Sequence, residues 1–262
     1  METILIFFLK ASTLIGVYFL AYHFLLRKET FFTTNRWFLM AGLFTSVLLP
    51  LFFIKKVIWI KRKETPFNEM VPYSESANAI PAPETFSIDW NQIMIACYAI
   101  VVLILIIKIA VNLFSLFKLL NNKEVEKRDQ FSLVDLNEDI APFSFFNYIV
   151  YNSNYYTNDE LRSILLHEKI HSQEKHSIDV MIAKLFCIVF WFNPFVWLYK
   201  KAMIQNLEYI ADYKACTQIE DRKVYQKALL KVVTHQNCLS ITNQFYQSLI
   251  KKRIVMLNKN QS

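Results

Sequence analysis

One pentapeptide in the sequence, His-Glu-Lys-Ile-His at residues 167–171, has residue types and a spacing that could support metal chemistry. Side chains four residues apart lie on one face of an α-helix, so His167 and His171 could bind the same metal ion. Glu168 could then take a proton from a water molecule at that ion. The spacing is typical of zinc-dependent peptidases, but it also arises by chance, so the surrounding sequence must support it.

The residues before the pentapeptide predict the helix that this chemistry needs. Thr157 and Glu160 form a capping box, and leucine and isoleucine recur after it at helical spacing. His167 and His171 are in phase with this apolar stripe, so both are expected to face the protein interior. The alternative is a pair of buried histidines that bind backbone carbonyl groups and no metal.

A catalytic zinc ion needs a third protein ligand, for which Glu208 is the best candidate. Asp212 follows one helical turn later and could accept a hydrogen bond from a metal-binding histidine. A solvated acidic helix face is the alternative for both residues. Tyr209 and Tyr213 are near in sequence, but no donor for the oxyanion is identified. Four other side chains compete with Glu208 as ligands: Glu174, His176, Asp179 and Glu220.

The composition predicts a membrane protein, because 54% of the 262 residues are hydrophobic and 23 are phenylalanine. Three stretches are long enough to cross a bilayer core of about 30 Å. The first has no signal-peptide cleavage site and should be retained. The stretches are residues 3–26, 37–54 and 92–117. The expected organisation is two membrane helices in 1–61, a flexible loop in 62–90, a third membrane helix in 91–118 and a membrane-associated peptidase domain in 119–262.

A fourth apolar stretch, residues 180–199, lies between the predicted ligands His171 and Glu208. A straight helix over residues 178–199 would be about 33 Å long and would put these ligands on opposite sides of the membrane. Both must come within about 2 Å of one ion, so the stretch should double back. We expect either a re-entrant hairpin broken at Asn193-Pro194 or a segment packed at the membrane surface.

Five segments occur in order: APFSFF at 141–146, LHEKIH at 166–171, WFNPFVW at 191–197, Glu208 with Asp212, and KRIVML at 252–257. Together they resemble the BlaR/MecR-type integral-membrane metallopeptidases, the antirepressor class of gluzincins. The resemblance covers residues from about 140 to the C-terminus and the layout of the hydrophobic N-terminal half. It implies that His167, His171 and Glu208 bind Zn²⁺ and that Glu168 is the catalytic base. We expect no β-lactam sensing, because these 262 residues show no penicillin-binding sensor domain like that of the β-lactam receptors.

Residues 129–152 are aromatic and β-prone, and they predict two or three strands of a small sheet beside the histidine helix. Gluzincin-like enzymes hold substrate by adding it to such an edge. We therefore expect residues 143–151 to form a substrate-binding edge strand, with contacts from Phe143, Ser144, Phe145 and Phe146. The alternative is a strand that only packs the helix. The expected fold is a mainly α membrane protein: three transmembrane helices, a re-entrant or membrane-surface segment, and a small α+β gluzincin-like domain.

The charge distribution bears on orientation. Arg27, Lys28 and Arg36 favour a cytoplasmic loop after the first span, whereas five positive residues at 55–63 would then lie outside. Residues 200–262 contain eleven Lys or Arg and four Asp or Glu, a surface suited to the anionic lipids of the cytoplasmic leaflet. The resemblance also implies a cytoplasmic catalytic domain. We expect a multi-pass protein of the bacterial cytoplasmic membrane.

The predicted function is that of a membrane-embedded zinc endopeptidase with a regulatory role. Its substrate would be itself, a repressor or another membrane-proximal protein. Two alternatives are a non-catalytic signalling scaffold with a structural zinc site and a Ste24/HtpX-like membrane quality-control protease. The lipid bilayer is an expected partner, a homodimer is left open, and no nucleic acid is expected because no recognition motif accompanies the basic residues. The two glycines exclude a glycine-rich phosphate-binding loop.

Overall fold

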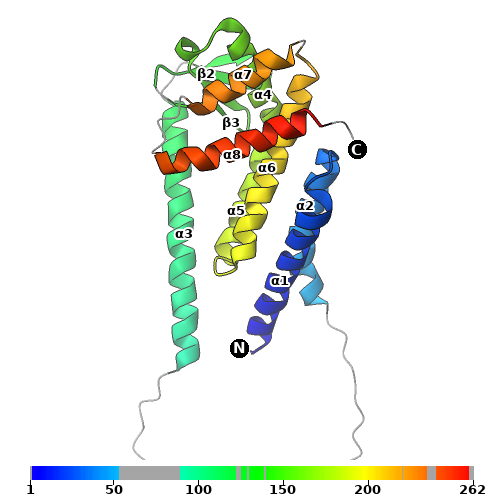
Figure 1. Ribbon diagram of the computed structural model, residues 1–262. Coiled ribbons are helices and arrows are strands. Elements are labelled where there is room, and N and C mark those ends of the chain that lie inside the picture. Colours follow the sequence, from blue (N-terminus) through cyan, green and yellow to red (C-terminus); the bar gives the residue numbers. More distant parts are fainter. Residues whose placement is uncertain are drawn as a thin grey trace, which may run out of the picture.

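The computed structural model describes residues 2–52, 89–121, 125–128, 130–138, 140–219, 221–234 and 240–259. Long helices extend from one side of a smaller part that contains a sheet and shorter helices (Figure 1). The N-terminus lies at the far end of the long helices, and the C-terminal helix lies across their near end (Figure 1). Most of the predicted loop 62–90 falls outside the described residues.

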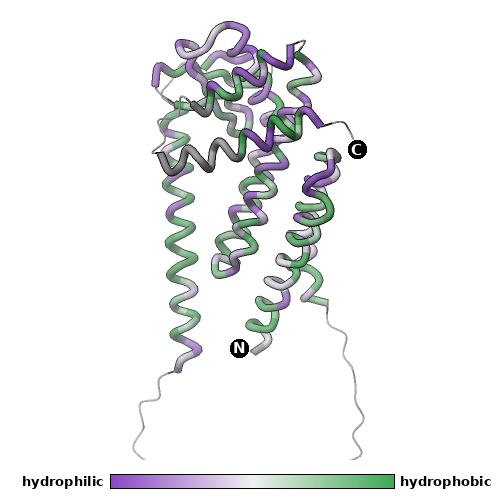
Figure 2. The backbone as a smooth tube through the Cα atoms, viewed as in Figure 1, coloured by the Kyte–Doolittle hydropathy of each residue, from purple (hydrophilic) through white to green (hydrophobic). Residues whose placement is uncertain are grey.

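Two helices are long and apolar enough to cross a membrane. They are Thr3–Leu26, formed by α1 (Glu2–Ala21) with the π turn η1 (Tyr22–Leu26), and α3 (Trp90–Asn121). Both are hydrophobic along most of their length (Figure 2), and the apolar side chains of α3 are largely exposed. An exposed apolar surface of this size marks an interaction site, and lipid tails would cover it.

The predicted second span, 37–54, corresponds to α2 (Phe32–Leu48) and the short turn η2 (Leu49–Leu51). With 17 residues, α2 is shorter than the two candidate membrane helices. The end of the predicted span falls outside the described residues, so three spans remain a prediction. α2 packs closely on α1 and α6 at Gly42, where any side chain would collide with the Tyr199 hydroxyl and the Tyr18 ring.

The apolar stretch 180–199 doubles back, as its length and the predicted ligands required. It forms α5 (His176–Val189) and the start of α6 (Pro194–Cys216). Asn193 caps α6, since its side chain accepts a 2.9 Å hydrogen bond from the Phe195 amide, and Pro194 follows in the first turn. Asn193 also donates to the Ser12 carbonyl of α1, and the Tyr98 hydroxyl of α3 donates to the Val189 carbonyl. The hairpin tip therefore lies beside both candidate membrane helices, which favours the re-entrant alternative.

The sheet has four described strands: β1 (Glu126–Arg128), β2 (Phe131–Asp135), β3 (Phe143–Phe145) and β4 (Tyr148–Tyr151). Their order is β1-β2-β4-β3, with β2 and β4 parallel and the outer pairs antiparallel. The prediction of two or three strands in residues 129–152 is confirmed, because β2, β3 and β4 lie there. The additional strand β1 was not predicted, because it is charged and exposed and has no apolar pattern. Residues 143–151 are also two strands rather than one. Phe146 has a φ of 50° in the turn between them, and of these two strands β3 lies at an edge of the sheet while β4 lies inside it.

Three further helices complete the smaller part: α4 (Asn158–Gln173), α7 (Arg222–Thr234) and α8 (Ser240–Leu257). The predicted capping box of α4 is confirmed, with Glu160 and Thr157 bonded to each other's amides at 3.0 and 3.4 Å. Lys175, at a φ of 56°, reverses the chain from α4 into α5. The buried cluster of Ile170, Ala211 and Tyr225 joins α4, α6 and α7. This packing fixes the helix faces that carry the candidate site.

Candidate metal centre

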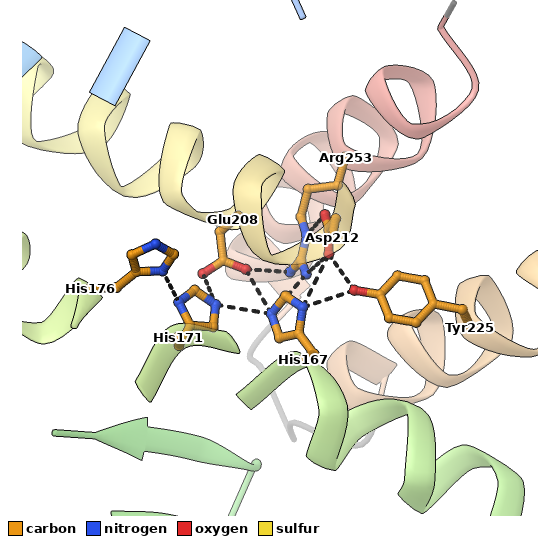
Figure 3. A network of polar contacts seen from close by, with 7 residues as sticks. All are labelled: His167, His171, His176, Glu208, Asp212, Tyr225 and Arg253. Carbon is orange, nitrogen blue, oxygen red and sulfur yellow. Dashed lines mark hydrogen bonds and ion pairs between the residues drawn. The ribbon is translucent and has the colours of Figure 1, made fainter. Parts of the chain in front are cut away.

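The structure brings His167, His171 and Glu208 together. α4 presents the histidines and α6 presents Glu208, and one ligand atom from each lies within 4.8 Å of the others. The two Nε2 atoms are 3.1 Å apart, and the Glu208 carboxylate oxygens lie 3.4 and 3.6 Å from them (Figure 3). Two imidazole nitrogens and a carboxylate oxygen are a donor set that suits zinc. The residues therefore fit the predicted metal, and their role as ligands stays a prediction.

The far ring nitrogen of His167 is held by two acceptors. Nδ1 lies 2.8 Å from the Tyr225 hydroxyl and 3.3 Å from Oδ1 of Asp212. The Tyr225 hydroxyl donates its own proton to Asp212 at 2.7 Å, so its oxygen accepts from His167. His167 is then protonated on Nδ1, and the Nε2 lone pair points into the cluster. Asp212 thus lies where the sequence placed it, but it shares the histidine with Tyr225, which was not predicted.

His176 orients the second histidine. Its Nδ1 lies 2.7 Å from Nδ1 of His171, and a neutral pair needs one donor between them. If Nδ1 of His171 donates to Nδ1 of His176, then Nε2 of His171 is free for a metal. Neutral His176 must then be protonated on its own Nε2. That Nε2 atom is buried and has no partner among the described residues. Burial is the main cause that lowers the pKa of His171, and burial with the nearby His171 and Arg36 lowers the pKa of His176 to about 2.

Arg253 of α8 closes the other side of the cluster. Its guanidinium binds Asp212 through Nε and Nη2 at 2.7 and 2.6 Å, and Glu208 through Nη1 at 2.9 Å. Burial raises the pKa of Glu208, but Arg253, His171 and His167 outweigh burial and hold that pKa well below its usual range. Glu208 is therefore ionised, the form that binds a cation.

Sequence reasoning missed the roles of Arg253, Tyr225 and His176. Arg253 belongs to the KRIVML segment that carried the family resemblance, and this was the only signal available for it. The two tyrosines considered from the sequence do not line the cavity at this site. Tyr209 accepts a hydrogen bond from Gln205, and both Tyr209 and Tyr213 pack near Phe32 of α2.

Two of the rival ligands, Glu174 and Asp179, are engaged in ion pairs away from the cluster, whereas His176 contacts His171. Arg36 of α2 binds Glu174 at 3.0 Å and Asp179 at 2.8 Å, and Lys214 also pairs with Glu174. These contacts neutralise both carboxylates and tie the N-terminal helices to the turn that follows the histidine motif. Glu220 lies outside the described residues.

The cluster opens into a cavity of about 1160 Å³, which Glu168 lines together with the three predicted ligands. Phe143, Ser144 and Phe145 of the edge strand β3 line the same cavity. Phe146 does not line the cavity. Its amide donates to the Ser177 hydroxyl, and its carbonyl accepts from Ser172. A substrate-binding role for β3 stays a prediction.

The comparisons with known proteins concern the same part of the chain. Residues 145–257 match the family model described as BlaR1 peptidase M56. The regulatory protein BlaR1 of Bacillus licheniformis is 32% identical over 111 residues, which are 38% of this chain and 18% of that protein. The regulatory protein BlaR1 of Staphylococcus aureus is 25% identical over 127 residues, 46% of this chain and 20% of that protein. The chain thus aligns with about a fifth of each relative.

The matched region contains every residue of the cluster, including Tyr225 and Arg253. The match to a peptidase family and the histidine-histidine-glutamate cluster, a donor set that suits a metal ion, therefore fall in the same part of the chain. Residues 145–257 of this chain are thus similar to the BlaR1-type M56 peptidases.

Proposed function

We propose that the protein is a membrane-embedded, zinc-dependent endopeptidase with a regulatory role. The observation that carries the proposal is the convergence of His167, His171 and Glu208 beside Glu168 in one cavity. When bound, zinc would polarise a peptide carbonyl and make water a stronger nucleophile. The match to a peptidase family and the name of the two relatives, regulatory protein, support the same function.

The side chains would divide the work as follows. Glu168 accepts a proton from the attacking water and passes it to the leaving amine. Tyr225 and Asp212 hold the ring of His167, and His176 holds that of His171, so both Nε2 atoms face the metal position. Arg253 keeps Glu208 ionised and in place. Positioning of this kind removes the need to order the ligands during the reaction.

The proposed location is the bacterial cytoplasmic membrane, with the catalytic domain on the cytoplasmic side. The two apolar helices and the hairpin of α5 and α6 beside them support a membrane setting, and the basic residues after 200 support this side. The substrate would be the chain itself, a repressor or another protein close to the membrane.

The test compares the purified full chain with Glu168→Ala and Glu208→Gln in detergent, by zinc content and by cleavage of a peptide pool. Glu168→Ala should keep zinc and lose cleavage, and Glu208→Gln should lose both. Equal cleavage by Glu168→Ala and the wild type would refute the proposal. Bound zinc without any cleavage in the wild type would favour the signalling scaffold.

A further inference from the structure

The cavity at the metal centre has an uneven charge distribution. The acidic side chains that line it are Glu168 and Glu208, and both belong to the centre. Away from the centre, the charged lining residues among the described part of the chain are all basic: Arg27, Lys184, Lys201 and Lys252. A cleft lined by one sign of charge attracts ligands of the opposite sign.

Two of these basic residues lie on the hairpin of α5 and α6. Lys184 is about 12 Å along α5 from His176, and Lys201 is about 10 Å along α6 from Glu208, at 1.5 Å per residue. Both side chains are exposed. Neither forms an ion pair within the described residues, although Arg36, Lys214, Lys231 and Arg253 all do.

The position of the hairpin makes these unpaired charges unusual. Its tip contacts Tyr98 of α3 and Ser12 of α1, well inside the two candidate membrane helices. Lys184 and Lys201 lie between the tip and the metal centre, and Ile109 and Leu113 of α3 line the same cavity. Ionisable side chains at membrane depth are costly, face water-filled cavities and mark the paths of substrates.

We propose that Lys184 and Lys201 select substrates with an acidic side chain near the scissile bond. An extended peptide rises about 3.3 Å per residue, so a distance of 10–12 Å corresponds to about three to four residues from that bond. The aliphatic wall formed by Ile109, Leu113 and Leu116 would accept apolar residues of the same peptide. This inference rests on the proposed peptidase function and adds a substrate preference to it.

An anionic lipid headgroup is the competing occupant. The peptide is favoured because both lysines share a cavity with Glu168 and the predicted ligands. They also lie partway along the hairpin, near the aliphatic residues of α3, whereas headgroups collect at the membrane surface.

The experiment uses the full chain, loaded with zinc, in nanodiscs of zwitterionic lipid. Matched peptides carry Glu, Gln or Lys three or four residues from the cleaved bond, on either side of it, and kcat/KM is measured for each. The wild type should cleave the Glu peptide about tenfold or more faster than the Lys peptide. Lys184→Gln/Lys201→Gln should remove most of this preference, and Lys184→Glu/Lys201→Glu should reverse it.

Two control variants separate charge recognition from damage to the fold. Lys223→Gln/Lys227→Gln, at exposed positions of α7 outside the cavity, should keep the wild-type preference. Lys184→Arg/Lys201→Arg should keep it as well, because the charge is retained. The peptide series on the wild type needs no variant and can refute the inference alone.

The outcomes are distinct. Equal cleavage of the three peptides, with Glu168→Ala inactive, overturns the charge preference and leaves the peptidase function standing. A preference that survives Lys184→Gln/Lys201→Gln overturns the assignment to these lysines. If the substitutions change only the response to added phosphatidylglycerol, the lysines bind lipid and the inference is wrong. If the wild type cleaves no peptide, the proposed function fails and the inference fails with it.

Discussion

The metal centre differs from the part of the cavity lined by Lys184 and Lys201, here called the lower cavity, in whether its charged side chains are paired. In the centre, Arg253 binds Glu208 and Asp212, and Tyr225 and His176 hold the two histidines (Figure 3). In the lower cavity, Lys184 and Lys201 have no ionic partner within the described residues. The centre is organised by the chain itself, because an unpaired buried charge is very costly. The lower cavity is open, and its charges are arranged for a ligand from outside.

The largest expected effect follows from breaking the organised side of this comparison. Arg253→Ala would leave the buried Asp212 carboxylate and Glu208 without their cation, at a cost of about 3 kcal/mol. Chemical denaturation in detergent, combined with zinc titration, measures stability and ligand positioning together. Arg222→Ala, at an exposed position of α7, should change stability by no more than about 0.5 kcal/mol. Equal effects of the two substitutions would contradict the role of Arg253.

Arg36→Gln tests the link between the N-terminal helices and the metal centre. The substitution removes the cation that Glu174 and the buried Asp179 share, and should destabilise the protein by about 2 kcal/mol. Zinc affinity should also fall, because this contact fixes the turn that carries His176. Arg162→Gln, at an exposed position of α4, is the control. If Arg36→Gln and Arg162→Gln have the same melting temperature and the same zinc affinity, the contact of Arg36 with Glu174 and Asp179 is not needed for the metal centre.

Tyr225→Phe tests whether the centre depends on its hydrogen bonds beyond the ligands. Losing the hydroxyl leaves Asp212 and His167 to share a longer 3.3 Å contact. Zinc affinity should fall about tenfold, measured by competition with a zinc-binding dye. Tyr209→Phe removes a hydrogen bond that Gln205 donates and that does not involve the two histidines, so it should leave zinc affinity unchanged.

The smallest effect concerns the cap of the histidine helix. Hydrogen bonds from Lys231 and from the Thr157 amide lower the pKa of Glu160 from 4.5 to about 2. Because the folded pKa is depressed, the stabilisation is present above pH 4.5 and is lost as the pH falls towards 2. The melting temperatures of the wild type and Glu160→Gln should therefore converge over that range. A difference that stays constant with pH would contradict this contribution.

The sequence by itself determined the parts of the site that lie within one helix. The capping box and apolar stripe fixed α4 and the phase of His167 and His171, because helical periodicity is a local property. The distance argument between His171 and Glu208 also required residues 180–199 to reverse, as the break before Pro194 shows. Each of these conclusions needed only the spacing of residues along the chain.

The tertiary structure alone decided which distant side chains complete the centre and the cavity. Arg253, Tyr225 and Arg36 reach the site or its supporting turn from separate helices, and the place of β3 at the sheet edge depends on strand pairing. Lys184 and Lys201 carry no pattern in the sequence that sets them apart from surface lysines. Their significance comes from the hairpin, which folds them into a cavity beside apolar helices, where a charge needs a partner.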